Sequence, residues 1–479
     1  MSESGAAVEG RSTVEAEPEA VRRRPGKVLM VSYNYPPVGA IGSVRTTKLA
    51  KYLPARGWNP TILTVRADAT KWGGGDAAEG ENPGVRVVRA PFTDVLTSVQ
   101  GVLAKIGLVK PGRAGEESLL RMPGRGSGGG VGRLAHGLFR WVKRWLAFPD
   151  RYLLWIPSAV AYGLRELSGG GYDVIYSTSP PVTDHLAAAV LSGFSGLPWV
   201  ADYRDPWSGN DLRGYTRFQR SMHARLERAV MRRAAAVVAA TGPWARALED
   251  LLERPGGVIC ITSGYDPDDF RTVAPSPVEG FVVTYTGTVH WLEKDGGLAA
   301  LAAALEEVLS GAQAEEFRVR LCYYGPHGRA FSEVAGALSA GDALEIHGPV
   351  PRSESLLRQR ESTILLLLMR NSPYAATLHT GKVFEYLGAR RPILAWAPAG
   401  GAVVELLEET GAGVAVATRE GLADVLRRWN DEFRRTGGVA YRGSEEALSR
   451  YAWPNLARKM ASVMDSLVGQ RQRGGDARC

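Results

Sequence analysis

Short apolar runs alternate with amphipathic helical patterns along most of this chain, and this alternation restricts the fold more than any other feature. Strands that alternate with helices predict a mostly parallel sheet with helices on both of its faces. Within residues 27–260, the amphipathic segments include 182–193 and 214–235. The apolar runs there are KVLMVSY, NPTILTV, VRVVRA, YDVIYST, PWVADY and RAAAVVAAT.

The same pattern starts again at residue 281, after a stretch rich in Pro and Gly. A chain of 479 residues is too long for one ordinary core, so two α/β domains of similar size are expected. In open parallel sheets, ligands bind at the carboxyl ends of the strands, which here would line a cleft between the domains. The second set of runs is FVVTYTG, FRVRLCYYG, ALEIHG, STILLLLM, RPILAWA and GAGVAVA.

The positive charge of the chain is concentrated in one region. Residues 95–170 hold eleven Lys or Arg against four Asp or Glu, which accounts for seven of the net charge of +8. Such a local excess is typical of an interaction patch and argues against nucleic-acid binding. Three cysteines without C-x-x-C spacing fit a reducing compartment, and no apolar stretch is long enough to span a membrane. Residues 1–26 are expected to be a disordered leader rather than a signal peptide.

A glycine loop follows the first predicted strand, in KVLMVSYNYPPVGAIGSVR (27–45). Gly39 and Gly42 would let backbone N–H groups approach a phosphate or a sugar, with the following helix supplying a favourable dipole. A plain strand–helix turn explains the same glycines. Neither half of the chain has G-x-G-x-x-G followed by an acidic residue about 20 positions on, which disfavours a dehydrogenase.

A basic amphipathic helix is predicted within VGRLAHGLFRWVKRWLAF (131–148), in an insertion at about 95–155. On a helical wheel, aromatic and leucine side chains gather on one face and Arg and Lys on the other. This composition favours contact of 131–155 with an anionic membrane surface. An ordinary core-packed helix with a solvated basic side is the alternative. The two faces are Leu134, Leu138, Trp141, Trp145 and Phe148, against Arg133, Arg140, Lys143 and Arg144.

Five stretches, in order over residues 27–467, together resemble the GT-B glycosyltransferases, and among them the retaining family-four type of bacterial polysaccharide and glycolipid synthesis. The stretches are VSYNYPPVGAIGSVR, YDVIYSTSPPVTDHLAAAVL with LPWVADYRDPWS, ITSGYDPDDF, YTGTVHWLEKDGG and TGKVFEYLGARRPILAW. The resemblance implies two Rossmann-like doubly wound domains facing a cleft, with a C-terminal helix returning to the N-terminal domain. The expected parts are the domains 27–262 and 281–450, a hinge linker 263–280, a helix 451–470 and a tail 471–479.

The resemblance implies a nucleotide-sugar site in the second domain. Thr380, Gly381 and Lys382 begin a predicted helix, whose free N–H groups would bind a diphosphate. Lys294 would add a point charge, and Glu385, one turn further on, would accept the ribose hydroxyls. A solvated helix residue is the alternative for Glu385. The sequence departs from the family at Thr377, where the first Glu of Glu-x7-Glu is usual, and at Thr288, where Arg is usual.

Candidate catalytic residues lie after strands of the first domain. Arg204 and Asp205 would orient the acceptor or line the sugar site, or else form a buried pair that pins a loop. His185 begins a helix after a strand, where it would face the cleft or serve as a structural histidine. Asp266-Pro267-Asp268 matches the metal-binding D-x-D of another glycosyltransferase fold, but its Pro-rich setting favours a hinge turn.

The resemblance implies transfer of a sugar from a nucleotide-diphosphate sugar to an acceptor hydroxyl, with retention and without a metal or other cofactor. The expected setting is cell-envelope polysaccharide or glycolipid assembly, in the cytoplasm or peripherally at the inner membrane face, with a sugar or lipid-linked acceptor. Transfer to a soluble natural product is one alternative. A catalytically silent relative that binds nucleotide or partner proteins is another, because of Thr288 and Thr377.

Overall fold

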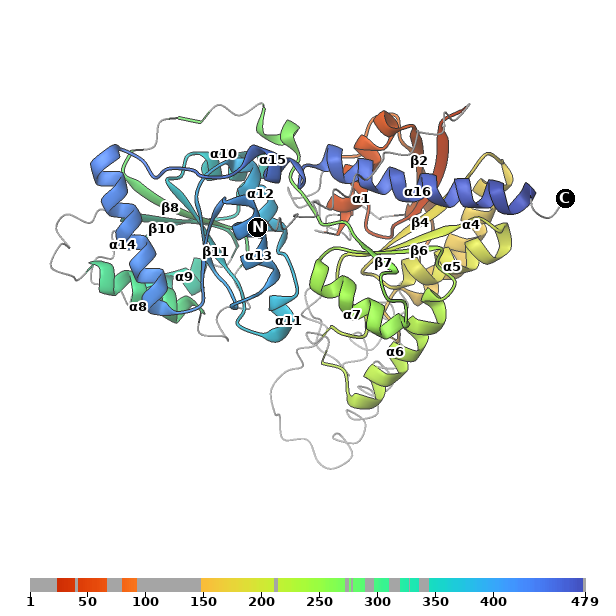
Figure 1. The fold of residues 1–479 in the computed structure, drawn as a ribbon, viewed down its shortest axis with the longest axis horizontal. Coiled ribbons are helices and arrows are strands. Elements are labelled where there is room, and N and C mark those ends of the chain that lie inside the picture. Colours follow the sequence, from red (N-terminus) through yellow and green to blue (C-terminus); the bar gives the residue numbers. More distant parts are fainter. Residues whose placement is uncertain are drawn as a thin grey trace, which may run out of the picture.

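The computed structural model describes residues 24–38, 42–66, 80–92, 148–210, 214–271, 275–276, 279–288, 297–309, 319–326, 328–335 and 344–476. These residues form two α/β domains that lie side by side, with the last helix reaching from the second back over the first (Figure 1). Gly39, Lys294 and nearly all of the predicted basic helix, 131–147, lie outside the described residues.

The N-terminal domain has a seven-stranded sheet in the order β3-β2-β1-β4-β5-β6-β7, and every pairing is parallel. The first strand lies inside the sheet and the chain winds outward in both directions, which is the predicted doubly wound topology. The strands are β1 (Gly26–Val31), β2 (Trp58–Val65), β3 (Arg86–Ala90), β4 (Val174–Ser179), β5 (Trp199–Tyr203), β6 (Ala236–Ala239) and β7 (Val258–Cys260).

Helices cover both faces of this sheet. Leu29 and Val31 of β1 pack in a cluster that also holds side chains of α5 and α7, whereas Val28 and Met30 pack in a second cluster with α1. Burial on both faces explains why the strands are continuous apolar runs rather than alternating ones. The helices are α1 (Ser43–Tyr52), α4 (Ile156–Ser168), α5 (Thr183–Ser195), α6 (Arg217–Met231) and α7 (Gly242–Leu252), with short 3₁₀ turns η1 (Pro54–Arg56) and η2 (Leu153–Trp155).

The C-terminal domain repeats the plan with a six-stranded parallel sheet in the order β10-β9-β8-β11-β12-β13. Its strands are β8 (Phe281–Thr286), β9 (Val319–Tyr324), β10 (Leu344–His347), β11 (Ile364–Leu368), β12 (Ile393–Trp396) and β13 (Gly413–Val416). Its helices are α8 (Gly297–Leu309), α9 (Gly328–Ala335), α10 (Arg352–Arg360), α11 (Pro373–Ala376), α12 (Gly381–Ala389), α13 (Ala402–Thr410), α14 (Arg419–Thr436) and α15 (Glu445–Ser449). The 3₁₀ turn η4 (Pro267–Phe270) precedes this domain.

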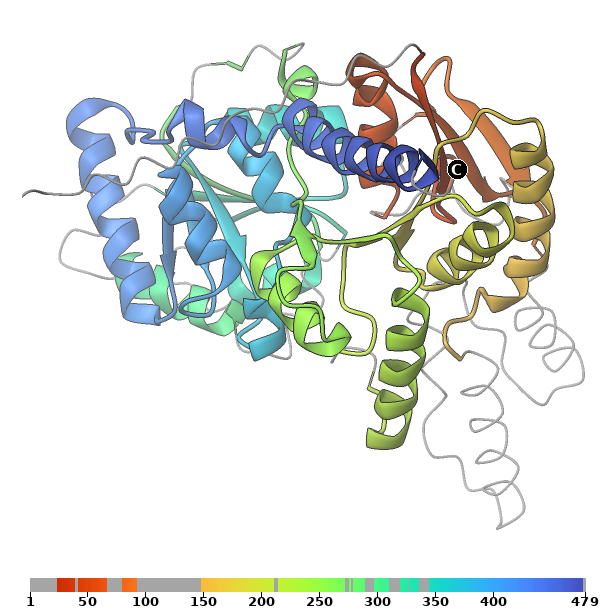
Figure 2. The same ribbon diagram turned by 45° about the vertical axis from the view of Figure 1, so that its right-hand side comes forward.

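The last helix, α16 (Trp453–Asp476), returns to the N-terminal domain as predicted and lies along α1 (Figures 1 and 2). Its apolar side chains, Trp453, Leu456 and Met460 among them, share a core cluster with β1. The chain leaves the C-terminal domain where Tyr265 pairs with Ala452. The Tyr265 N–H donates to the Tyr451 carbonyl, and the Tyr265 carbonyl accepts from the Trp453 N–H, at 3.0 Å each.

Three predicted boundaries are wrong. The chain is helical beyond 470, because α16 continues to Asp476 and the tail does not begin at 471. The leader ends earlier than 26, because Gly26 opens β1 and Arg24 forms an ion pair with Asp173 at 2.9 Å. The helix predicted at 451–470 begins later than expected, because α16 starts at Trp453. Within the described residues, no helix has both the length and the apolar character needed to cross a bilayer.

Candidate functional site

The start of α12 faces the loop that follows β8, and the two together form the best candidate for an anion-binding site. Thr380 occupies the N-cap position with extended backbone, yet no side chain caps the helix there. The Thr380 hydroxyl is buried without a hydrogen-bond partner among the described residues. A helix start with uncapped N–H groups and its positive dipole end attracts a negatively charged group.

Lys382 lies between this helix start and the β8 loop. Its ammonium donates to the Tyr285 hydroxyl at 2.5 Å and to the Thr288 carbonyl at 3.2 Å, and it lies 4.3 Å from the centre of the Tyr285 ring. Burial lowers the pKa of Lys382 to about 7, although the charge of Glu385 acts in the opposite direction. The protonated lysine is therefore costly in the free protein and would be favoured by a bound anion.

Gly287 makes room for this lysine. Its φ of +100° suits glycine alone among the common residues, and a Cβ there would lie 2.5 Å from Lys382 Cε. The Tyr323 hydroxyl of β9 donates to the Gly287 carbonyl at 3.0 Å and so holds the loop that follows β8 in place. Thr288, where the resemblance led us to expect Arg, accepts from Lys382 through its carbonyl.

Glu385 lies one turn further along α12 and is ion-paired to Arg352, the first residue of α10. The other Arg352 nitrogen contacts Asp269 of η4 at 2.8 Å, and Asp269 contacts Lys48 of α1 at 3.1 Å. We call Lys48, Asp269, Arg352 and Glu385 the charge chain. It joins α1 of the N-terminal domain to α12 of the C-terminal domain. Sequence reasoning missed Arg352 and Asp269, because partners so far apart along the chain leave no local pattern.

Asp266 forms a hinge turn rather than a metal site in this structure. Its carboxylate caps η4 by accepting from the Asp268 N–H at 3.0 Å, and it accepts from Lys48 and Lys51 at 2.7 Å each. Tyr52 donates to it as well. Burial alone would raise the pKa of Asp266, but the hydrogen bonds from the two lysines and Tyr52 lower it to about 2.

On the N-terminal side, the structure brings Gly42 and Arg204 together. Gly42 precedes α1, and a Cβ at this position would collide with the Arg204 guanidinium. That guanidinium donates to the Pro180 carbonyl, and the Arg204 N–H donates to the Ser179 carbonyl at 3.0 Å. Burial lowers the pKa of Arg204, with Asp205 and Asp184 opposing the shift. The guanidinium therefore joins the loops that follow β4 and β5 to the start of α1.

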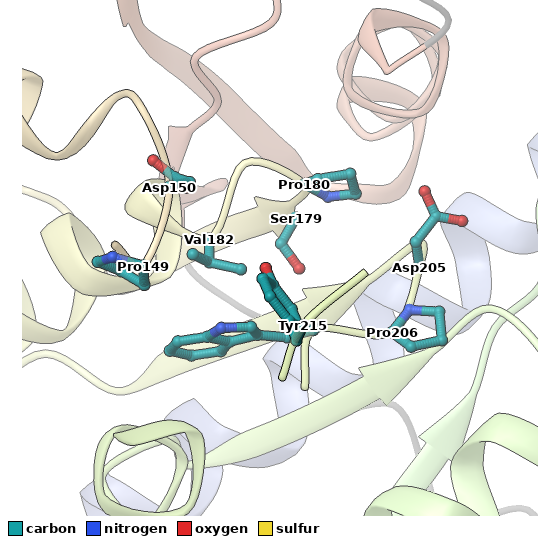
Figure 3. A pocket seen from close by; sticks show the side chains of 9 residues that line it. Pro149, Asp150, Ser179, Pro180, Val182, Asp205, Pro206 and Tyr215 are labelled. Carbon is teal, nitrogen blue, oxygen red and sulfur yellow. The ribbon is translucent and has the colours of Figure 1, made fainter. Parts of the chain in front are cut away.

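Asp205 lines a small cavity of about 10 Å³ between the loops that follow β4 and β5 (Figure 3). This volume suits a single water molecule. The hydroxyls of Ser179 and Tyr215 are turned towards it. Ser179 Oγ has no hydrogen-bond partner among the described residues, so the cavity offers a polar anchor beside Asp205.

His185 does not face a cleft, and this expectation is corrected. It is the third residue of α5, is fully buried, and shares a 2.7 Å hydrogen bond between Nδ1 and Ser177 Oγ of β4. Trp199 Nε1 donates to the same hydroxyl at 2.8 Å, and the ring lies 4.9 Å from that of Tyr203. Burial, aided by the charge of Arg204, lowers the pKa of His185 to about 3. The imidazole is therefore a neutral member of the core.

The two domains touch beside the candidate site. Thr241, the N-cap of α7, donates its hydroxyl to the Thr377 carbonyl at 2.6 Å. The Thr377 hydroxyl donates to the Tyr374 carbonyl at 2.8 Å. Thr377, where the resemblance led us to expect Glu, thus ends α11 and contacts the other domain.

Comparison with known proteins agrees with this architecture. Residues 42–264 match the family model described as "Glycosyl transferase 4-like domain". A search of curated proteins found none that matches the chain.

Three solved structures have similar folds. Sucrose-phosphate synthase from Thermosynechococcus elongatus is 15% identical, with 95% of this chain and 100% of that chain covered and a TM-score of 0.54. HepE of Anabaena, solved in complex with UDP and glucose, is 14% identical, with 92% and 100% covered and a TM-score of 0.54. The lipopolysaccharide outer core galactosyltransferase WaaB in its apo form is 10% identical, with 92% and 99% covered and a TM-score of 0.51.

At these identities the solved structures establish the fold alone. The family model covers residues 42–264, which lie in the N-terminal domain and the start of the linker. The doubly wound sheets and the returning α16 fit the same arrangement. Residues 42–264 match the model of a glycosyl transferase 4-like domain, and the chain as a whole has the GT-B fold.

Proposed function

We propose that this protein moves a sugar from a nucleotide-diphosphate sugar to an acceptor hydroxyl with retention of configuration, in the assembly of an envelope polysaccharide or glycolipid. The observation that carries the proposal is the placement of buried Lys382 between the uncapped start of α12 and the Gly287–Thr288 loop. A largely desolvated ammonium beside a helix start suits an anionic group such as a diphosphate.

The donor would bind across α12. Its diphosphate would accept from the N–H groups at Gly381 and Lys382 and from the Lys382 ammonium, with the buried Thr380 hydroxyl as a further donor. Its ribose hydroxyls would donate to Glu385, whose side chain is 27% exposed and shared with Arg352. HepE, which has a similar fold, is solved with UDP and glucose, and this supports a nucleotide sugar as the donor.

The chemistry would need positioning and positive charge more than a catalytic base. The bond between the anomeric carbon and the diphosphate oxygen breaks, and the acceptor oxygen bonds to the anomeric carbon on the same face. The acceptor proton passes to the departing phosphate oxygen. Lys382 and the helix start would stabilise the negative charge that develops on the leaving group. We propose that no metal ion is required, since these groups supply the charge.

The acceptor would bind on the N-terminal side. Gly42, held against Arg204, shapes one wall, and Asp205 supplies a carboxylate for a sugar hydroxyl beside the small cavity. If the acceptor is lipid-linked, the basic segment 131–155 would hold the protein at an anionic membrane surface.

Release of nucleoside diphosphate from UDP-, GDP- and dTDP-sugars tests the proposal, with a chelator present throughout. The variant is Glu385→Ala, and Glu408→Ala on the exposed side of α13 is the matched control. We expect slow hydrolysis of one donor by the native protein and the control, and at least a tenfold loss of donor affinity in Glu385→Ala. The anomeric configuration of the product, read by NMR, tests retention.

Binding without turnover, even with membrane extract as an acceptor source, would favour the catalytically silent relative. Absence of nucleotide binding would overturn the donor site. Equal turnover with a water-soluble acceptor and no dependence on anionic vesicles would favour a soluble natural product as acceptor.

A further inference from the structure

One face of β9 and β10, at the edge of the C-terminal sheet, carries polar side chains. Cys322 of β9 and Glu345 of β10 are direct register partners on neighbouring parallel strands, and His347 lies two residues further along β10. Residues two apart on a strand share a face, so the three side chains project to the same side. A cavity of about 450 Å³ lies over them.

The three side chains converge to a spacing that suits a metal ion. Cys322 Sγ lies 3.6 Å from Glu345 Oε2, and His347 Nε2 lies 3.3 Å from the same oxygen. One ligand atom from each residue lies within 4.8 Å of the others. Zn–S, Zn–N and Zn–O bonds of ordinary length at tetrahedral angles separate S from O by about 3.6 Å and N from O by about 3.4 Å. The observed separations therefore need little adjustment.

Neighbouring groups hold two of these side chains in place. Arg320 pairs with the other carboxylate oxygen of Glu345 at 3.2 Å, which leaves Oε2 directed at Cys322 and His347. The Tyr324 ring stacks on His347 with centroids 4.5 Å apart and an angle of 7°. Such outer contacts orient ligands in metal sites. Carboxylates also exceed guanidiniums around the cavity: Glu279, Glu345, Glu354 and Glu361 against Arg320 and Arg358.

We propose that Cys322, Glu345 and His347 form a three-ligand site for a divalent cation of the zinc class, with the fourth position open to the cavity. Thiolate with imidazole and carboxylate is a donor set that selects such a borderline-soft ion over Mg²⁺ or Ca²⁺. The site lies on the face of the sheet opposite to Tyr285 and Tyr323, which support the donor loop. It is thus separate from the proposed donor site and does not rest on it.

The competing explanation is a cluster of hydrogen bonds, in which the thiol and the imidazole both donate to the Glu345 carboxylate. The two explanations differ in what a thiol-binding metal does. A metal that binds all three groups displaces the thiol proton and forms a metal–sulfur bond. A hydrogen-bonded cluster binds such a metal weakly and without a fixed stoichiometry.

Cobalt(II) titration of the full-length protein, after chelator treatment and buffer exchange, distinguishes them. The background is Cys260→Ser with Cys479→Ser, which leaves Cys322 as the single thiol of the chain. We expect one cobalt per chain, with a sulfur-to-cobalt charge-transfer band and the strong visible bands of tetrahedral cobalt. Zinc should displace the cobalt and remove both signals.

Further substitutions in this background test each ligand. Cys322→Ser should abolish the charge-transfer band, and His347→Ala should weaken cobalt binding by more than about 100-fold, since even outer contacts of a metal site are worth about 10–100-fold. Arg320→Ala should weaken it by about 10-fold or more while the band remains. His347 is 41% exposed, so His347→Ala is expected to keep the fold and keeps the test valid should the variant at buried Cys322 fail to fold.

Stoichiometric cobalt with a thiolate band, lost or weakened in these variants, supports the proposal. The absence of a thiolate band at cobalt concentrations equal to the protein's overturns it. Equal cobalt affinity in His347→Ala and its parent overturns it as well, because the cation is then held elsewhere.

Discussion

Lys382 carries a charge that its surroundings penalise in the free protein. Burial beside Tyr285 lowers its pKa to about 7, although the charge of Glu385 partly opposes the shift. A diphosphate at the start of α12 would add negative charge beside the ammonium and raise the pKa again. Binding of the proposed donor and protonation of this one side chain would therefore be coupled.

The coupling predicts how donor affinity changes with pH. Above pH 7 the free lysine loses its proton, so binding must take up a proton, and affinity for the nucleoside diphosphate should fall by up to about tenfold per pH unit. In Lys382→Met this fall should vanish and affinity at pH 6.5 should be lower. Calorimetry from pH 6 to pH 9 measures both, with exposed Lys459→Met as control. The same pH profile in Lys382→Met and the native protein would contradict the assignment.

Among the structural elements, the hinge turn η4 is held by charges that the N-terminal domain supplies. Asp266 is fully buried and accepts from Lys48, Lys51 and Tyr52, while Arg45, buried against Asp202 at 2.5 Å, donates to the carbonyls of Ile261 and Thr262. Residues 261–269 therefore lie against α1, whose basic side chains bind them. Removal of one member of such a buried group leaves the others without a partner.

Asp266→Asn should accordingly destabilise the protein by about 3–5 kcal/mol, whereas Asp268→Asn, with a side chain 43% exposed, should cost about 1 kcal/mol or less. The pKa of Asp266 lies below its unfolded value of 3.8, so its stabilisation is present above pH 4 and lost as pH falls towards 2. Urea unfolding at pH 7 and at pH 3 measures both effects. Equal loss of stability in the two variants would contradict this account.

The elements were largely predictable from the sequence, and the exceptions have physical reasons. Strands buried on both faces are continuous apolar runs, so each predicted run contains a strand of the structure. The three-residue strand β7 is too short for a pattern and lies among Gly and Pro residues. The break between α15 and α16 depends on the pairing of Tyr265 with Ala452, which joins segments far apart in the sequence.

At the scale of the whole molecule, α16 makes the N-terminal core depend on the end of the chain. Met460 is fully buried in the cluster that contains Val28 and Met30 of β1. The N-terminal sheet therefore cannot complete its second face until the C-terminal domain has been traversed (Figure 2).

Met460→Ala should cost about 2–5 kcal/mol, with the loss felt in the N-terminal domain although the substitution lies near the C-terminus. Hydrogen exchange should show faster opening of β1 and β4, with the amides of β11 and β12 unchanged. The neighbouring exposed Lys459→Ala is the control. Faster exchange confined to the C-terminal sheet would contradict the conclusion that α16 stabilises the N-terminal domain.

The candidate site was less predictable than the fold. The α12 residues Thr380, Gly381, Lys382 and Glu385 form a local pattern, and the structure places them on one helix beside the β8 loop. Gly42 and Arg204 meet only because parallel strands bring their loops to the same edge. The position of His185 after a strand does not determine which way its side chain points, so its burial could not be predicted from the sequence. Arg352 and Asp269 could not be foreseen, since ion pairs between distant segments leave no periodicity.

If the proposed donor binds at Glu385, the charge chain would link the hinge to the donor site thermodynamically. A ribose whose hydroxyls donate to Glu385 would compete with Arg352, and the other guanidinium nitrogen of Arg352 contacts Asp269, which in turn contacts Lys48. Linkage is reciprocal, so whatever the donor does to the hinge, the hinge does to donor affinity by the same factor. Lys48, buried in α1 of the N-terminal domain, would thereby influence nucleotide affinity without contacting the nucleotide.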